Sequence, residues 1–206
     1  IFFFRKFAEK KDKMGNYTTE QLNKEIQIRQ NNLRNQMQET GANALILTTN
    51  VNLFYLTGNI YGGYMYFPIE GEPIHFIKRS NGTIHKNSIT IRKPEQIAEE
   101  LQKAGRKLPE KLLLETDSIP YNECNRIIAA LGNPQIQNGS VLMRTVRSIK
   151  TEYEINQLRQ AGKIQVEVYK KIPSLYRRGM TDLDLQIEIE HQMRMHGSIG
   201  IFRTFG

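Results

Sequence analysis

The histidines and the closely spaced carboxylates are the residues of this sequence whose types could support metal chemistry. His191 and His196 fall on one predicted helix, where metal-binding pairs stand four residues apart so that both rings share a face. These two are five residues apart, which rotates one ring about 140° from the other. We therefore interpret them as surface or partner-contact residues. Asp182 and Asp184 fall in the first turn of the same helix, where carboxylates satisfy free backbone donors, and we interpret them as caps.

Cys124 is the one cysteine of the chain, which excludes an intramolecular disulfide and favours a reducing, cytoplasmic compartment. It falls on a predicted helix ahead of Ile127 and Ile128, and no neighbouring base is visible, so a buried thiol is favoured over a nucleophile. The glycine-rich segment 61–64 lacks the spacing of a phosphate-binding loop and is interpreted as a loop entering a strand. The residues alone assign no catalytic, metal-binding or cofactor-binding side chain.

The composition is that of an ordinary soluble globular protein. The chain has 206 residues, of which 39% are hydrophobic and 24% charged, and a formal net charge of +8. Residues 1–14 hold five basic and two acidic residues, and the remaining basic excess is dispersed, so we expect no nucleic-acid binding. No apolar run approaches the ~18 residues of a membrane helix. Because Ile1 is not a normal initiator and Met14 is a more natural start, we treat residues 1–13 as a doubtful leader.

Apolar periodicity predicts an α/β domain in the first two thirds of the chain. Residues 18–41 read as a helix that opens on a capping-box pattern and ends at Gly41. Further helices are predicted over residues 94–105 and 120–131, and strands over residues 44–48, 53–56, 64–69, 74–78, 89–91, 111–115 and 141–143. Such an alternation of strands and helices indicates a mixed sheet flanked by helices.

The pattern becomes helical after about Arg147. A capping box at residues 151–154 opens a long helix that Pro173 must kink or end. A second helix, ending at Gly197, carries an apolar stripe that we expect to be exposed and to promote self-association. The stripe consists of Leu185, Ile189 and Met193.

The change of pattern divides the chain into two parts. We expect an N-terminal domain over residues 14–147 and a second unit over residues 148–206. The second unit is predicted to hold two helices and a strand near residues 199–202, too little to close a core of its own.

Four segments carry a resemblance to a known family. Residues 147–155, 158–162 and 178–182 precede a Glu-rich helix that ends at His196 and Gly197, and upstream lies the motif of residues 52–58, Asn-Leu-Phe-Tyr-Leu-Thr-Gly. In this order and spacing they resemble the creatinase/prolidase family of pita-bread metallopeptidases. The upstream motif is similar to a strand-to-turn motif of that family's N-terminal domain, and the others are similar to the start of its catalytic domain.

The resemblance implies a peptidase that cleaves Xaa-Pro bonds with two divalent metals, manganese or cobalt, held by two Asp, one His and two Glu. Hard cations suit such a ligand set, and a metal-bridging hydroxide attacks the scissile carbonyl. The ligands fall downstream of the segment matched by residues 201–206, so none is assigned to this chain, which we expect to be inactive alone. The family's N-terminal domain shapes the entrance for peptides with proline in second position and packs on a partner subunit, which implies a homodimer.

Two alternatives remain. A creatinase-like relative would hydrolyse small non-peptide C–N compounds, and only pocket residues outside this sequence would distinguish it from a peptidase. A non-catalytic relative of the same fold would serve as a stand-alone interaction module, a folded partner-binding protein whose reading frame ends near Gly206.

Overall fold

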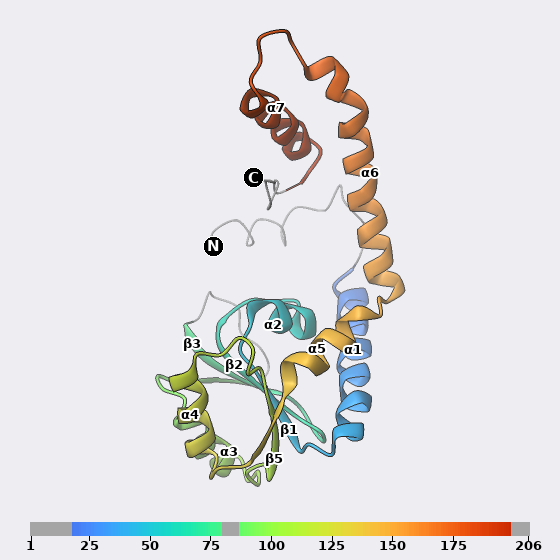
Figure 1. The fold of residues 1–206 in the computed structure, drawn as a ribbon. Coiled ribbons are helices and arrows are strands. Elements are labelled where there is room, and N and C mark those ends of the chain that lie inside the picture. Colours follow the sequence, from blue (N-terminus) through green and yellow to red (C-terminus); the bar gives the residue numbers. More distant parts are fainter. Residues whose placement is uncertain (1–17, 80–86, 199–206) are drawn as a thin grey trace. The chain divides into compact units, whose positions relative to one another are not determined.

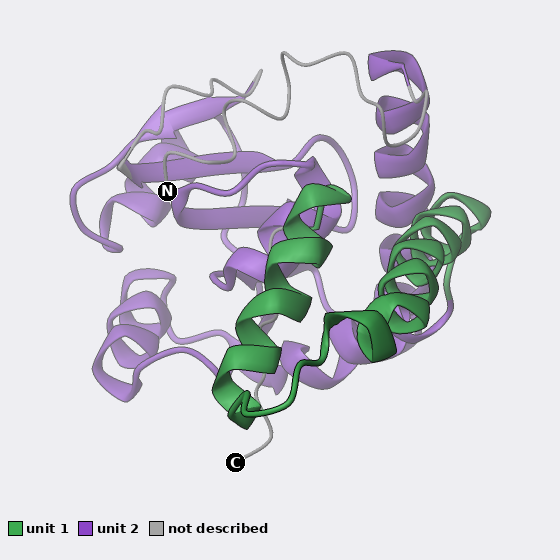
Figure 2. Cartoon of the chain, turned by 90° about the horizontal axis from the view of Figure 1, so that it is seen from above, with its two compact units in different colours: residues 1–17, 150–206 green, residues 18–149 purple. Residues whose placement is uncertain are grey.

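The computed structural model describes residues 18–79 and 87–198, which form two compact units. Residues 18–149, purple in Figure 2, form one unit, and the described residues from Lys150 onward, green in Figure 2, form the other. In chain order they are called the first and the second unit below, the reverse of the numbering in the figure key. The first unit is an α/β domain, and the second is helical over its described part. No helix among the described residues is long and apolar enough to cross a membrane.

A six-stranded mixed sheet forms the centre of the first unit, with the strand order β4-β3-β2-β1-β5-β6. The pairs β1–β2 and β2–β3 are antiparallel, whereas β1–β5, β5–β6 and β3–β4 are parallel. The strands are β1 (Ala44–Leu47), β2 (Gly62–Pro68), β3 (Ile74–Arg79), β4 (Ser88–Thr90), β5 (Lys111–Leu114) and β6 (Gln135–Asn138). This confirms the predicted α/β class with a mixed sheet.

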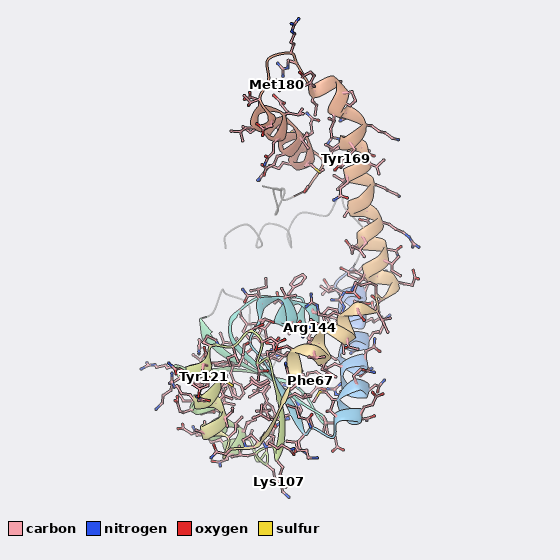
Figure 3. All side chains as sticks on the ribbon, in the orientation of Figure 1. Phe67, Lys107, Tyr121, Arg144, Tyr169 and Met180 are labelled. Carbon is pink, nitrogen blue, oxygen red and sulfur yellow. The ribbon has the colours of Figure 1, made fainter. Side chains whose placement is uncertain are left out.

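Helices cover both faces of the sheet (Figure 1). On one face lie α1 (Thr19–Thr40), α2 (Asn50–Thr57) and α5 (Gly139–Ser148), and on the other α3 (Gln96–Lys103) and α4 (Tyr121–Ala130). Alternate residues of β1 serve the two cores: Leu45 and Leu47 face α1, α2 and α5, whereas Ala44 and Ile46 face α3 and α4. Because both faces are buried, β1 is apolar throughout. Phe67 of β2 lies in the first of these cores (Figure 3).

Helix α1 has the predicted ends. The Thr18 hydroxyl accepts from the Gln21 amide while the Gln21 side chain accepts from the Thr18 amide, so the capping box is complete. Gly41 ends the helix with a left-handed φ of 67°, which glycine adopts without a steric cost. The buried side of the helix includes Leu33 and Met37, both completely inaccessible to solvent.

The predicted strand over residues 53–56 is wrong, because these residues lie in helix α2. The segment is apolar on all sides, with Leu53 and Leu56 buried and Phe54 exposed, and such a short run does not reveal its period. The helix ends at Gly58, whose φ is 71°. The motif of residues 52–58 is therefore a helix-to-turn motif rather than a strand-to-turn motif.

The predicted strand over residues 141–143 is also wrong, because these residues belong to helix α5. The last strand of the sheet is β6, directly upstream. Its sequence is polar apart from Ile136, since it forms an edge of the sheet and has no fully buried residue. Asn138 ends this strand and at once caps α5, its side chain accepting from the Ser140 amide at 2.8 Å.

The second unit contains α6 (Glu152–Leu175) and α7 (Asp182–Met195), which pack against each other. Both open on capping boxes, the one at Thr151 as predicted from the sequence and a second one at Thr181. Pro173 does not end α6, which continues to Leu175. Because Pro173 lies so close to the end of α6, it removes only one of the last helical hydrogen bonds, and this small loss does not interrupt the helix. The strand predicted near residues 199–202 lies outside the described residues.

The expected exposure of the apolar stripe on α7 is also wrong. Met193 is buried, and Leu185 and Ile189 are half-buried, because α7 turns this side inward as it packs on α6. The exposed apolar side chains of α7 are instead Leu183 and Ile187. The helix therefore carries apolar residues on two sides, which its low amphipathicity reflects.

Candidate functional site

A buried carboxylate, that of Glu115, is the centre of a polar cluster in the first unit. Glu115 directly follows β5 and is 1% exposed. One oxygen, Oε2, accepts from the backbone amides of Thr48 and Thr49, the latter at 2.8 Å, and from the Thr48 hydroxyl at 3.1 Å. The other, Oε1, accepts from the Thr49 hydroxyl at 2.8 Å and from the Asn52 amide nitrogen. Five donors thus replace the water that the charge has lost.

The topology of the sheet explains why these groups meet. Strands β1 and β5 are parallel neighbours, so their carboxyl ends lie at the same edge of the sheet. Thr48 and Thr49 follow β1 and lead into α2, while Glu115 follows β5. The negative charge therefore sits at the amino end of α2, where free backbone N–H groups and the helix dipole favour an anion.

Arg147 extends this cluster to the end of the unit. Its Nη1 donates to the Asn52 Oδ1 at 3.1 Å, so the Asn52 side chain is held between Glu115 and the last turn of α5. We call Glu115, Thr48, Thr49, Asn52 and Arg147 the Glu115 cluster. Since Glu115 and Asn52 are 1% and 6% exposed, these two groups are shielded from any substrate in solution, and the cluster has the character of a structural site.

A second buried pair lies between β3 and the segment before β2. The Tyr61 hydroxyl and the His75 Nδ1 are 2.8 Å apart, and the two rings meet edge to face with centroids 5.6 Å apart. Burial raises the pKa of Tyr61, so its phenol stays protonated. Segment 61–64, expected to be a loop entering a strand, largely belongs to β2, whose register shifts between Gly62 and Gly63.

A third cluster lies at the other face of the sheet, partly open to solvent. The Tyr64 hydroxyl donates to Glu123 of α4, and Lys78 donates to the same carboxylate at 2.8 Å while lying over the Tyr64 ring. Partial burial opposes ionisation of Glu123, but the hydrogen bonds from Lys78 and Tyr64 lower its pKa. Beside it on α4, Arg126 binds both oxygens of Glu95. These are paired charges that join α4 to its neighbours.

The structure does not bring His191 and His196 together as ligands. His191 is exposed on α7. His196 caps the end of that helix, with its Nδ1 2.8 Å from the Gln192 carbonyl oxygen and its Nε2 3.2 Å from the Lys171 Nζ. A carbonyl can only accept and an ammonium can only donate, so Nδ1 carries the proton and Nε2 accepts. Both ring nitrogens of His196 are therefore engaged within the second unit.

The two aspartates of α7 have the roles expected of them, whereas the cysteine is less buried than expected. Asp184 accepts from the Thr181 amide at 2.9 Å and from its hydroxyl at 2.7 Å, and these hydrogen bonds lower the pKa of Asp184. Asp182 accepts from the Leu183 amide at 2.9 Å. Cys124 is half-buried on α4, and burial raises the pKa of its thiol. A raised pKa disfavours the reactive thiolate.

Metal ligation does not fit the residues that the structure describes. Over residues 18–79 and 87–198, no group of three or more His, Cys, Asp or Glu side chains is placed to hold a metal ion. The ligand set implied by the family resemblance thus has no counterpart among these described residues.

Sequence reasoning did not find the Glu115 cluster. It assigned Glu115 to a strand, Thr48 to the preceding strand, and Asn52 and Arg147 to family motifs without a physical role. The available signal was a carboxylate directly after three buried leucines, since a charge at that position must be paired. Its partners follow a strand more than sixty residues upstream, and only the pairing of β1 with β5 brings them close.

Comparison with known proteins shows the family to which this chain belongs. Residues 29–149 match the family model of the creatinase/prolidase N-terminal domain, so the chain belongs to this family. The matched region covers nearly the whole first unit, including the Glu115 cluster.

Individual relatives extend the match. The chain is 24% identical over 176 residues to the uncharacterized peptidase YqhT of Bacillus subtilis (strain 168), covering 81% of this chain and 48% of that protein. The fold of this chain is similar to that of a Xaa-Pro dipeptidase from Bacillus anthracis (TM-score 0.69, 20% identity). It is also similar to that of a dipeptidase, PepE, from Mycobacterium ulcerans (TM-score 0.66, 18% identity). Each match covers 85% of this chain, and 50% and 51% of those chains, respectively.

The extent of these matches matters for function. Residues 1–149 make up less than three quarters of the chain, so a similarity that covers 85% of it continues into the residues of the second unit. The chain spans about half the length of the relatives it matches. The family relationship and the fold are thus common to chain and relatives, and the activity of the whole protein is a separate question.

Proposed function

We propose that this chain is the N-terminal portion of a metal-dependent Xaa-Pro peptidase of the dipeptidase or aminopeptidase P type. In this proposal residues 14–147 form the domain that shapes substrate access and contributes to a homodimer. Residues 148–206 begin the catalytic domain, whose two divalent metals, manganese or cobalt, are bound by residues outside this sequence. The chain by itself is inactive. The presence of one cysteine supports a reducing, cytoplasmic compartment.

The match of residues 29–149 to the creatinase/prolidase N-terminal domain is the observation that carries this proposal. The relatives include a Xaa-Pro dipeptidase and a dipeptidase, which favours peptides with proline in second position as substrates. The Glu115 cluster supports a non-catalytic role for the first unit, because its carboxylate is fully used by internal donors.

The reading frame beyond Gly206 provides the first test. The proposal expects it to continue into two Asp, one His and two Glu at metal-ligand spacing. A stop codon at this point would overturn the peptidase assignment and favour the interaction module. If the frame continues, the longer product is assayed with an Ala-Pro dipeptide and with creatine. Turnover of creatine alone would overturn the peptide substrate and favour the creatinase-like alternative.

A further inference from the structure

Both polar atoms of the Asn52 side chain form hydrogen bonds. Its Nδ2 donates to the Glu115 Oε1, and its Oδ1 accepts from the Arg147 Nη1 at 3.1 Å. A flipped amide would direct oxygen at a carboxylate and nitrogen at a guanidinium, two repulsive contacts, so one orientation is imposed. Asn52 is 6% exposed, and water cannot readily replace either partner.

Glu115, which follows β5 at the edge of the sheet, determines the orientation of the Asn52 amide. All its hydrogen bonds among the described residues go to Thr48, Thr49 and Asn52, and none goes to Arg147. An influence of Glu115 on Arg147 through hydrogen bonds must therefore pass through the Asn52 amide. The influence is strong in principle, because a buried carboxylate with five donors cannot move without leaving several of them unsatisfied.

Arg147 is the basic residue in the last turn of α5, the final element of the first unit. The helix ends at Ser148, and Ile149 is extended, with φ −88° and ψ 116°. Residues from Lys150 onward belong to the second unit. Arg147 thus lies in the last helical turn of the first unit.

We propose that Glu115, acting through Asn52, is a positioning residue that holds the last turn of α5. The hydrogen bonds couple the shared edge of β1 and β5 to the last turn of α5, both within the first unit. It does not depend on the proposed peptidase function, since its basis is the hydrogen bonding within residues 18–149.

Amide hydrogen exchange on the full chain tests this proposal. Glu115→Gln keeps the size of the side chain but replaces one acceptor oxygen by a donor. We expect exchange at the amides of residues 146–148 to accelerate by about tenfold, a usual size for coupling between sites. In an Asn52→Ala background the same substitution is expected to change these amides by less than about twofold. Unchanged exchange in the single variant, or an equal acceleration in both backgrounds, would overturn the proposal.

A control and a reciprocal variant complete the experiment. Arg144→Gln removes a guanidinium from the same helix, but one whose partner is the exposed Asp117, so it should leave the amides of Thr49 and Asn52 unchanged. Arg147→Gln should accelerate exchange at those two amides, because coupling is reciprocal. If Glu115→Gln fails to fold, the Arg147→Gln variant decides the question. Unchanged exchange at the amides of Thr49 and Asn52 in that variant would contradict the proposal.

Discussion

At Glu115 and Gly139, the residue type that the fold requires depends on neighbours that are distant in sequence. Glu115 accepts from Thr48 and Thr49 across the β1–β5 pairing. Gly139, the first residue of α5, is buried, and a Cβ placed there would lie 2.7 Å from the Leu45 Cδ1. The partners of Glu115 and the close contact at Gly139 are not visible locally, whereas the capping boxes at Thr18 and Thr151 were predicted correctly because a capping box involves only four consecutive residues.

Gly139→Ala is expected to destabilise the first unit by about 1–3 kcal/mol, because the added methyl overpacks a filled contact. The backbone nitrogen of Leu114 also lies close to that methyl, at 3.2 Å, and cannot move aside easily. Gly162→Ala is the matched control, since nothing lies within 4 Å of its Cβ position on α6. It should stabilise that helix by about 0.5–1 kcal/mol. Urea unfolding of both variants measures this, and equal stability of Gly139→Ala and wild type would contradict it.

Cys124 is expected to react slowly with a thiol reagent at neutral pH. Burial raises the pKa of the thiol, so less thiolate is present in the folded chain than in the unfolded chain. Modification by Ellman's reagent should be several-fold slower in native buffer than in urea, and should accelerate as the pH rises. A native rate equal to the unfolded rate would show that the thiol is not protected.

At the scale of elements, strongly periodic helices and the short apolar strands were predictable, whereas α2 and β6 were not. Helices α1, α6 and α7 follow from repeated apolar spacing and their caps. Helix α2 has eight residues and no polar side, so its sequence does not distinguish a helix from a buried strand. Strand β6 is a polar edge and gives no apolar alternation to detect. Tertiary packing decides both cases.

The start of α7 is expected to depend on pH through Asp184. Hydrogen bonds from Thr181 lower the folded-state pKa of Asp184 below its unfolded value. The stabilisation is therefore present above the unfolded pKa and is lost as the pH falls through the folded pKa. The amide chemical shifts of Thr181 and Leu185 should report this loss in an acid titration.

Two variants at the start of α7 separate the cap from general charge effects. Asp184→Ala should loosen the first turn already at neutral pH and abolish the titration. Asp182→Ala, which removes a carboxylate bonded only to the next amide, should retain it. An unchanged titration midpoint in Asp184→Ala would contradict the assignment of the cap.

At the scale of the whole molecule, the second unit presents apolar side chains to solvent on both of its helices. Leu158, Val166 and Tyr169 of α6 are 53–66% exposed, and Leu183 and Ile187 of α7 are 55–61% exposed. Figure 3 shows Tyr169 on α6, and Tyr121, also exposed, on α4 of the other unit. Exposed apolar surface of this kind favours association.

Self-association of the chain is therefore expected to increase with concentration in sedimentation velocity experiments. The double variant Leu183→Lys with Ile187→Lys should shift the chain toward the monomer, because it places two charges on the exposed side of α7. Val141→Lys, at a position of α5 that is 52% exposed, is the control and should leave association unchanged. A wild-type chain that stays monomeric at all concentrations would exclude this surface as an interface.

The release of proline from an Ala-Pro dipeptide in the presence of Mn²⁺ tests the central proposal most directly. The 206-residue chain and the longer product of its reading frame are compared at equal concentration. We expect chelator-sensitive turnover by the longer product and none by the chain, because the metal ligands lie outside this sequence in the proposed function. Chelator-sensitive turnover by the 206-residue chain alone, or its absence from the longer product, would contradict the account.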